Sequence, residues 1–307
     1  MEQQNNAKFA FFYMLSLFSL IFMAIAVGMI IFQIINKEIV DIITDYRGRY
    51  EPDALKSGIS SLIIATPIFF ITMRQIYKNL FLGILDKDSA IRKWLSYFIL
   101  FVSSVVMIIW LIMTINSFLD GELTFKFFLK ALTALAIAAS IFTFYFYDIK
   151  RKEVKEKKDL IIRIYFYASL IVIISVFIAS LFVVESPMET RNRKTDEAVL
   201  NDFNSIDNAV QNYFREKERL PESLTILKDE FPYITEDDLK HPSSNENYAY
   251  NKLEDKKYEL CASFLTSNIS DTDLNGFNKE MWPHDSGAQC LSRKIEQIYE
   301  PRPQLLR

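Results

Sequence analysis

Histidine, cysteine and glycine are scarce in this chain, which has two histidines, two cysteines and seven glycines in 307 residues. The glycines are scattered singly, so no glycine-rich loop can hold a phosphate, and neither G-x-S-x-G nor H-E-x-x-H occurs. Both histidines, His241 and His284, follow the last long apolar run, which disfavours haem ligation between membrane helices. The sequence therefore carries no common enzyme motif.

Charge is missing from five long stretches of the first 184 residues, and these stretches predict membrane spans. Lys8 and Lys37 enclose 28 uncharged residues, more than the roughly 20 that a helix needs to cross hydrocarbon. The other uncharged windows are Ser57–Met73, Trp94–Leu119, Ala131–Tyr147 and Ile164–Val184. The second window contains Pro67 and, like the fourth, lies close to the lower limit for a span.

Polar residues inside these windows are hydroxyls and amides, and none of them ionises near neutral pH. Proton pumps and ion-coupled transporters usually place charged groups at membrane depth, so their absence counts against this class. A carrier or channel for a small uncharged solute stays open, because hydroxyl groups could line its path.

The loops between the windows differ in positive charge, which predicts the orientation. Thirteen Lys and Arg lie before the first span and in the second and fourth loops, against six in the first and third loops. The first apolar run is too long for a signal peptide and lacks a cleavage site, so we expect an uncleaved anchor. The N-terminus is thus predicted to be cytoplasmic and the C-terminal domain extracytoplasmic, in a multi-pass protein of the plasma membrane.

The second half of the chain is acidic and has a different periodicity. From Glu185 onward it has 16 Lys and Arg against 24 Asp and Glu, which argues against nucleic acid as a partner. Apolar residues from Val199 to Phe214 recur at helical spacing and predict an amphipathic helix, capped by Thr195 or Asp196. A second short helix is expected to run through Leu227.

Two tyrosine-rich segments further along predict a β-hairpin. They are Asn247–Asn251 and Lys257–Phe264, and the polar pair Glu254–Asp255 lies between them as a turn. The C-terminal region is therefore expected to be a small α+β domain.

The segment from Phe9 to Lys152 resembles an uncharacterised four-span membrane domain of candidate-phylum bacteria. The resemblance is carried by the stretches FAFFYMLSLFSL, RKWLSYFILF, DGELTFKFFLKAL and FTFYFYDIKRK. It implies a membrane topology and no assigned activity.

The region from Ile164 to Lys294 resembles type IV pilins and type II secretion pseudopilins. The matching stretches are AVQNYFREKERLPESLTIL, YAYNKLEDKKYELCASF and MWPHDSGAQCL. The resemblance implies a span, an amphipathic helix and a small antiparallel sheet. This chain lacks the leader-peptidase site and the early glutamate of pilins and has four spans ahead of the domain, so it cannot be released and polymerised in their usual way.

Cys261 and Cys290 both fall in the domain predicted to be exported, where oxidation is possible. A structural disulfide is the favoured interpretation. A zinc site with His241 and His284 is an alternative, although the usual C-x2-C and H-x3-H spacings are absent. A buried, unpaired cysteine is the other alternative.

Asp271, Asp273 and Asn275 alternate ahead of Gly276, as ligands do in the front half of a calcium loop. Trp282 stands where a bidentate glutamate is expected. Glu280 or Asp285 would therefore have to supply the missing carboxylate ligand. Some pseudopilins bind calcium in this region, which favours calcium by resemblance alone. The competing interpretation is a polar turn.

Ser286 and His284 are the one pair that could be considered as a nucleophile and a base. They lie two residues apart in a predicted loop, where such side chains more often contact solvent than take part in catalysis. The sequence thus predicts an all-α membrane bundle of about five helices with a small pilin-like α+β domain. The predicted divisions are a four-span domain at 1–163, a fifth span at 164–187 and an extracytoplasmic domain at 188–307. The expected function is a non-enzymatic anchor that contacts an envelope or secretion partner. The alternative is a carrier or channel for a small uncharged solute, and an exported hydrolase is the third candidate.

Overall fold

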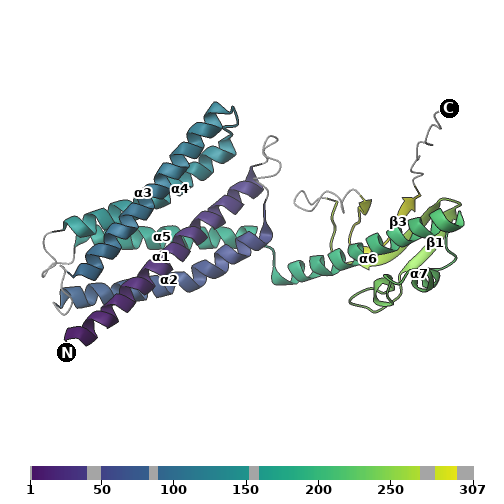
Figure 1. Cartoon of the computed structure of the whole chain (residues 1–307), viewed down its shortest axis with the longest axis horizontal. Coiled ribbons are helices and arrows are strands. Elements are labelled where there is room, and N and C mark those ends of the chain that lie inside the picture. The colour runs from purple at the N-terminus through teal and green to yellow at the C-terminus, as the bar shows by residue number, and fades with distance from the viewer. Residues whose placement is uncertain (1, 40–49, 83–88, 152–158, 270–280, 296–307) are drawn as a thin grey trace, which may run out of the picture. The chain divides into compact units, whose positions relative to one another are not determined.

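A computed structural model describes residues 2–39, 50–82, 89–151, 159–269 and 281–295, without the side chains of residues 2–7. The chain divides into two compact units, residues 1–184 and residues 185–307. The first unit is a helical bundle, and the second combines helices with a sheet (Figure 1).

The bundle consists of five long helices. They are α1 (Glu2–Glu38), α2 (Pro52–Phe81), α3 (Ala90–Leu119), α4 (Phe125–Lys150) and α5 (Leu160–Val183). Each is long and apolar enough to cross a membrane. The second and fourth windows of the sequence lie within helices of 30 and 26 residues, so neither is too short to span.

The helices of the bundle pack mainly as two pairs, α1 with α2 and α3 with α4, and α1 also contacts α3, α4 and α5. Ala26, Ile30 and Leu62 lie in the buried core between α1 and α2. Gly58 allows the two helices to approach closely, because a Cβ atom there would lie 3.0 Å from Cγ1 of Ile30. The core thus depends on small residues at the α1–α2 contact.

The second unit begins with α6 (Pro187–Lys217), which is longer than the sequence predicts. Ser186 caps this helix by accepting a hydrogen bond from the amide of Glu189 at 3.1 Å. The prediction of a cap at Thr195 or Asp196 is wrong, since both residues lie inside the helix. Pro187 at the first helical position starts the helix there, because its fixed φ suits a first turn and its missing N–H costs nothing.

A three-stranded antiparallel sheet in the order β1-β2-β3 completes the second unit. Its strands are β1 (Ala249–Glu254), β2 (Lys257–Phe264) and β3 (Gly287–Lys294), preceded by α7 (Leu224–Glu230) and the 3-10 turn η1 (Asp237–Leu239). The predicted fold class, a membrane bundle of about five helices with a small α+β domain, is confirmed in this form. The β1–β2 hairpin forms as expected, with β1 shifted by a few residues.

The core of this unit lies between the apolar face of α6 and one face of the sheet. Phe203 of α6 is fully buried against Trp282, and their ring centroids are 5.3 Å apart. Tyr258 and Leu260 of β2 are also fully buried. Alternate residues of β2 point to the opposite, outer face of the sheet, which is the more exposed one.

Candidate functional site

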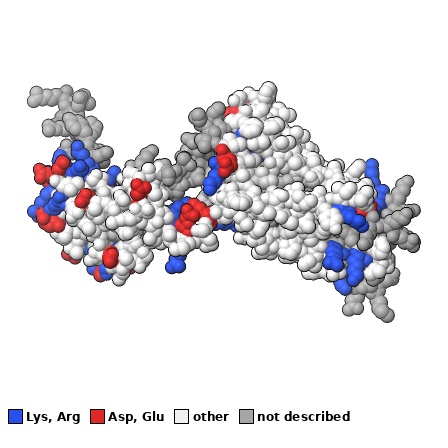
Figure 2. Space-filling model, turned by 180° about the vertical axis from the view of Figure 1, so that it is seen from behind, with Lys and Arg blue, Asp and Glu red and all other residues white. Residues whose placement is uncertain are grey.

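One end of the bundle gathers most of its positive charge. At this end α1 begins, α2 ends, α3 begins, α4 ends and α5 begins, and Figure 2 shows Lys and Arg grouped there beside a largely uncharged surface. Its described basic residues are Lys8, Arg74, Lys78, Arg92, Lys93, Lys150, Arg151 and Arg163. We call it the basic end.

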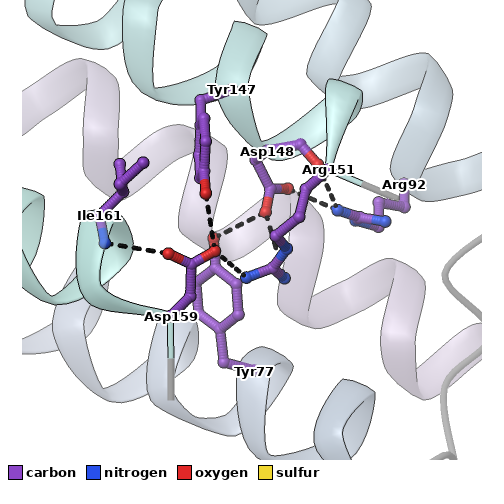
Figure 3. A network of polar contacts seen from close by, with 7 residues as sticks. All are labelled: Tyr77, Arg92, Tyr147, Asp148, Arg151, Asp159 and Ile161. Atoms are coloured by element: carbon purple, nitrogen blue, oxygen red, sulfur yellow. Dashed lines mark hydrogen bonds and ion pairs between the residues drawn. The ribbon is translucent and has the colours of Figure 1, made fainter. Parts of the chain in front are cut away.

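A network of polar contacts at the basic end centres on Asp148 of α4 (Figure 3). Nη2 of Arg92 on α3 donates to Oδ2 of Asp148 at 2.7 Å and to the backbone oxygen of Asp148 at 3.1 Å. The hydroxyl of Tyr77 on α2 donates to Oδ1 of Asp148 at 3.2 Å. Arg92 and Asp148 are only 9% and 6% exposed. Asp148 therefore connects three helices.

The network continues to α5 through Arg151, the residue at the C-terminal cap of α4. Arg151 lies 3.7 Å from the carboxylate of Asp148 and 3.3 Å from that of Asp159. Asp159 caps α5 through the amide of Ile161 at 2.9 Å and accepts from the hydroxyl of Tyr147 at 2.9 Å. Partial burial raises the pKa of Asp159, but the hydrogen bonds from Tyr147, Ile161 and Arg151 outweigh it and lower this pKa.

These contacts tie four helices together, and each charged group in the network has a partner of opposite charge. Paired charges in a buried position hold their geometry firmly, because breaking one pair leaves an uncompensated charge. The uncharged windows of the sequence missed this network because the third begins at Trp94, just after Arg92, and the fourth ends at Tyr147, just before Asp148. The signal available in the sequence was the opposite charge of these residues at matching ends of two consecutive spans.

Two apolar cavities in the described part of the bundle are relevant to function. One, of about 570 Å³, is lined by α1, α3 and α4, and it includes Ala24, Gly28 and Trp110. The other, of about 780 Å³, is lined by α1, α2, α4 and α5, and it includes Arg74 and Lys78. The second cavity thus differs from the first by having two basic residues in its lining.

In the second unit, carboxylates of α6 attach the rest of the domain to this helix. Asp196 is 2% exposed and accepts hydrogen bonds from the amides of Leu265 at 2.9 Å and Thr266 at 2.7 Å. Asp207 is 3% exposed and accepts from the hydroxyl of the fully buried Tyr258. These acids fix the position of the β2 strand and the loop after it. The sequence pattern indicates Asp196 only as a helix cap and does not single out Asp207.

Asp202 gives the domain a pH dependence that a single substitution can isolate. Burial raises the pKa of Asp202 to about 6, against the hydrogen bond from Tyr248, while Asp238 raises it further and His241 lowers it. The folded pKa lies above the ordinary value of 3.8, so ionisation of Asp202 destabilises the fold as pH rises from about 4 to above 6. Asp202→Asn cannot ionise, so its stability relative to the native chain is expected to rise over this range and to level off above it.

Urea unfolding of both proteins at pH 4, 5, 6 and 7 measures this difference. Asp229→Asn, on the exposed side of α7, is the matched control and is expected to show a smaller change with pH. The prediction is contradicted if the difference in the free energy of unfolding between Asp202→Asn and the native chain stays constant from pH 4 to 7.

Cys261 and Cys290 form a disulfide, and they face each other on the neighbouring strands β2 and β3. This is the pairing that the sequence favours. Because the two sulfurs are bonded to each other, they are not thiolate ligands for zinc. His241 instead contacts the backbone oxygen of Ser263 at 3.0 Å, and His284 stacks on Phe264 with ring centroids 3.9 Å apart.

Removing the disulfide is expected to destabilise the second unit. The two cysteines are 29 residues apart, and the chain-entropy treatment gives a loss of up to about 3–4 kcal/mol for a loop of this size. Urea unfolding of Cys261→Ser/Cys290→Ser tests this expectation. The native chain, purified without reductant and unfolded, is expected to show no free thiol, whereas two titratable thiols would disprove the bond.

The predicted calcium ligands Asp271, Asp273 and Asn275 lie outside the described residues, as does Glu280. Of the neighbouring positions, Trp282 is fully buried and donates from Nε1 to Oδ1 of Asn204 at 2.7 Å. Its place in the core explains why an aromatic residue stands at this position.

The serine and histidine considered for catalysis are placed differently from each other. Ser286 is exposed, whereas His284 is 2% exposed and its Nδ1 lies 3.0 Å from the backbone oxygen of Trp282. Within the described part of the chain, no hydrogen bond joins Ser286 to His284. His284 packs in the core of the unit, whereas Ser286 lies at the surface.

Residues 10–145 are similar to a domain of unknown function (DUF5671). The match covers most of the helical bundle and ends before α5 and the second unit. No curated protein and no solved structure matches the chain. The similarity thus concerns the first four spans and brings no activity with it.

Proposed function

We propose that this protein is a non-enzymatic anchor of the plasma membrane that presents a pilin-like domain outside the cell to an envelope or secretion partner. The observation that carries the proposal is the polar network at the basic end, in which Arg92, Asp148, Arg151 and Asp159 form ion pairs across α3, α4 and α5. A bundle locked in this way suits a support for another domain better than a carrier that changes shape.

The hydroxyl groups of the spans also favour an anchor over a carrier. Ser19 donates to the backbone oxygen of Leu15 at 2.6 Å, and Ser104 donates to that of Leu100 at 2.8 Å. Several other hydroxyls make the same contact within their own helix: Thr72, Thr114, Thr133, Ser140 and Thr143. Groups used in this way are less available to line a path for an uncharged solute.

The pilin-like character is supported by the order of elements in the second unit. A long amphipathic helix, the turn around Pro221 and a small antiparallel sheet follow one another as the resemblance implies. The disulfide supports an extracytoplasmic location, because disulfides persist mainly in oxidising compartments. The outer face of the sheet, with Asn251 and Ser292 exposed, offers a surface for a partner.

Reporter fusions test the orientation on which the proposal depends. A reporter after Arg307 is expected to behave as extracytoplasmic, and reporters in the connections 83–88 and 152–158 as cytoplasmic. A cytoplasmic signal from the C-terminal fusion would overturn the proposed location.

Site-specific photo-crosslinking in the native host tests for the partner. A photoreactive residue at Asn251 or Ser292, on the outer sheet face, is expected to give an adduct of one discrete mass. The same residue at Asn208, an exposed position of α6, is the control and is expected to give none. If neither sheet position gives an adduct that the control lacks, the proposal of a partner on this face fails.

A carrier or channel for a small uncharged solute is the second candidate, favoured by the cavities of about 570 and 780 Å³ in the bundle. Release of uncharged solutes from liposomes that contain the purified chain separates the two functions. Release faster than from empty liposomes supports the carrier, and equal rates support the anchor.

A further inference from the structure

We propose that the larger cavity of the bundle is a binding site for one anionic phospholipid, whose phosphate lies between Arg74 and Lys78. The cavity holds about 780 Å³ and is lined by four of the five helices. This inference concerns the bundle alone and does not depend on the proposed role of the second unit.

The two basic residues form a site for a single negative group. Arg74 and Lys78 are four residues apart on α2, so they lie on the same face of the helix one turn from each other. Both are exposed, and neither has an ion pair or hydrogen bond to another side chain among the described residues. Asp148 and Asp159, described acids at the same end of the bundle, are already paired with Arg92 and Arg151. Within the described part of the chain, the charges of Arg74 and Lys78 are therefore left for a ligand.

The remainder of the cavity suits an acyl chain. Apart from the two cations, its lining is mainly aliphatic and aromatic and includes Met23, Ile141 and Phe144. Ile71 and Phe166, also in the lining, are 62% and 42% exposed, so the cavity opens to the surroundings of the bundle. In a membrane those surroundings are lipid, which gives an acyl chain direct access.

The dimensions agree with one leaflet of a bilayer. On α2 the cavity lining runs from Pro67, near the middle of this helix, to Phe81, its last residue, and Lys78 lies near that end. The eleven residues of helix from Pro67 to Lys78 cover about 16 Å, close to half of the roughly 30 Å hydrocarbon core. A lipid with its phosphate at Arg74 and Lys78 would thus place its tail along the cavity toward the bilayer centre.

The smaller cavity provides an internal comparison. It holds about 570 Å³ and is likewise apolar, but no Lys or Arg belongs to its lining. Basic pockets between membrane helices are a recognised arrangement for anionic headgroups, whereas an uncharged groove has no preference among lipids. The preference for an anionic lipid is therefore assigned to the larger cavity.

Native mass spectrometry of the full chain, released from detergent in the presence of phosphatidylglycerol or phosphatidylcholine, tests the proposal. One phosphatidylglycerol is expected to bind well above the level of phosphatidylcholine. Because each basic residue near a membrane surface adds about a factor of five to binding of an anionic lipid, Arg74→Gln/Lys78→Gln is expected to bind roughly thirtyfold more weakly. The exchange Arg74→Lys/Lys78→Arg keeps both charges and is expected to retain most of the binding.

Lys150→Gln/Arg163→Gln is the matched control, since it removes two exposed charges from the same end of the bundle without altering the cavity. Ser169→Phe fills part of the cavity while leaving both cations in place, and it is expected to weaken binding as well. Undiminished binding by Arg74→Gln/Lys78→Gln, or an equal loss in the control, would overturn the proposal. Inorganic phosphate competing as well as the lipid would show that the cavity has no part in binding, and this too would overturn it.

Discussion

Asp148→Ala is expected to destabilise the bundle by roughly 3–5 kcal/mol, the usual result of removing one partner from a buried ion pair. The substitution leaves the guanidinium of Arg92, 9% exposed, without its partner at 2.7 Å, and Tyr77 without its acceptor. Thermal unfolding of the purified chain in detergent, followed by the helical signal in circular dichroism, measures the loss. Asp53→Ala is the control, because Asp53 is exposed and lies 3.8 Å from Lys56 in a surface pair of little energetic weight.

A double substitution tests whether the ion pair itself is the cause. Arg92→Met/Asp148→Leu removes both charges and keeps their approximate volume, so it is expected to lose less stability than Asp148→Ala alone. The single variants Arg92→Met and Asp148→Leu complete the comparison. If the stability lost by the double variant equals the sum of the losses of these two single variants, the residues contribute independently and the network has no role as a unit.

Phe203→Ala is expected to destabilise the second unit by roughly 3–5 kcal/mol, the usual range for truncating a buried aromatic side chain. Phe203 is fully buried and makes edge contacts with Tyr248, Phe264 and Trp282, with ring centroids 5.2, 6.1 and 5.3 Å away. Its removal leaves a cavity where α6 meets the sheet. Hydrogen exchange of the α6 and β2 amides in the full chain, as a function of urea concentration, reports the change within this unit.

Tyr233→Ala is the matched control, because Tyr233 is 53% exposed and contacts Asn212 at the surface of the same unit. Its loss is expected to stay below about 1 kcal/mol, as for other surface substitutions. Equal losses in Phe203→Ala and Tyr233→Ala would show that the α6–sheet core is not the main source of stability in this unit.

The polar network at the basic end places charged residues inside the helical bundle. The uncharged windows predict a bundle without ionisable groups at depth, whereas α3 and α4 carry Arg92 and Asp148 in buried positions at one end. Their mutual pairing, and the pairing of Arg151 with Asp159, gives these charges a role in holding helices together. Both the pairing of these charges and their scarcity in the spans count against an ion-coupled pump.

Local patterns were sufficient for the spans, the hairpin and the cysteine pair. An uncharged run of about 20 residues has few alternatives to a membrane helix, since only a helix satisfies its backbone in lipid. The hairpin was predictable because its turn and its alternating residues are adjacent in sequence. With only Cys261 and Cys290 available, the disulfide had one possible pairing.

The limits of the helices and the third strand were harder to predict from the sequence. Thr195 and Asp196 have the chemistry of a cap, yet Ser186 with Pro187 starts α6, and Asp196 accepts hydrogen bonds from the loop after β2. A carboxylate suits both positions equally well, so its residue type could not decide between them. Strand β3 has no adjacent partner in sequence, and its pairing with β2 depends on the contact that brings Cys290 opposite Cys261.

Hydrophobic length, periodicity and composition act locally, so the five apolar helices, the acidic α+β second half and the cysteine pair could be predicted from the sequence. Which charges meet depends on how the elements pack. Arg92 and Asp148 are 56 residues apart, and Asp207 and Tyr258 are 51 apart, so these pairs exist only where helix packing and sheet formation bring distant segments together. Arg74 and Lys78 are neighbours on α2, but only the packing of the other helices shows that they line an apolar cavity.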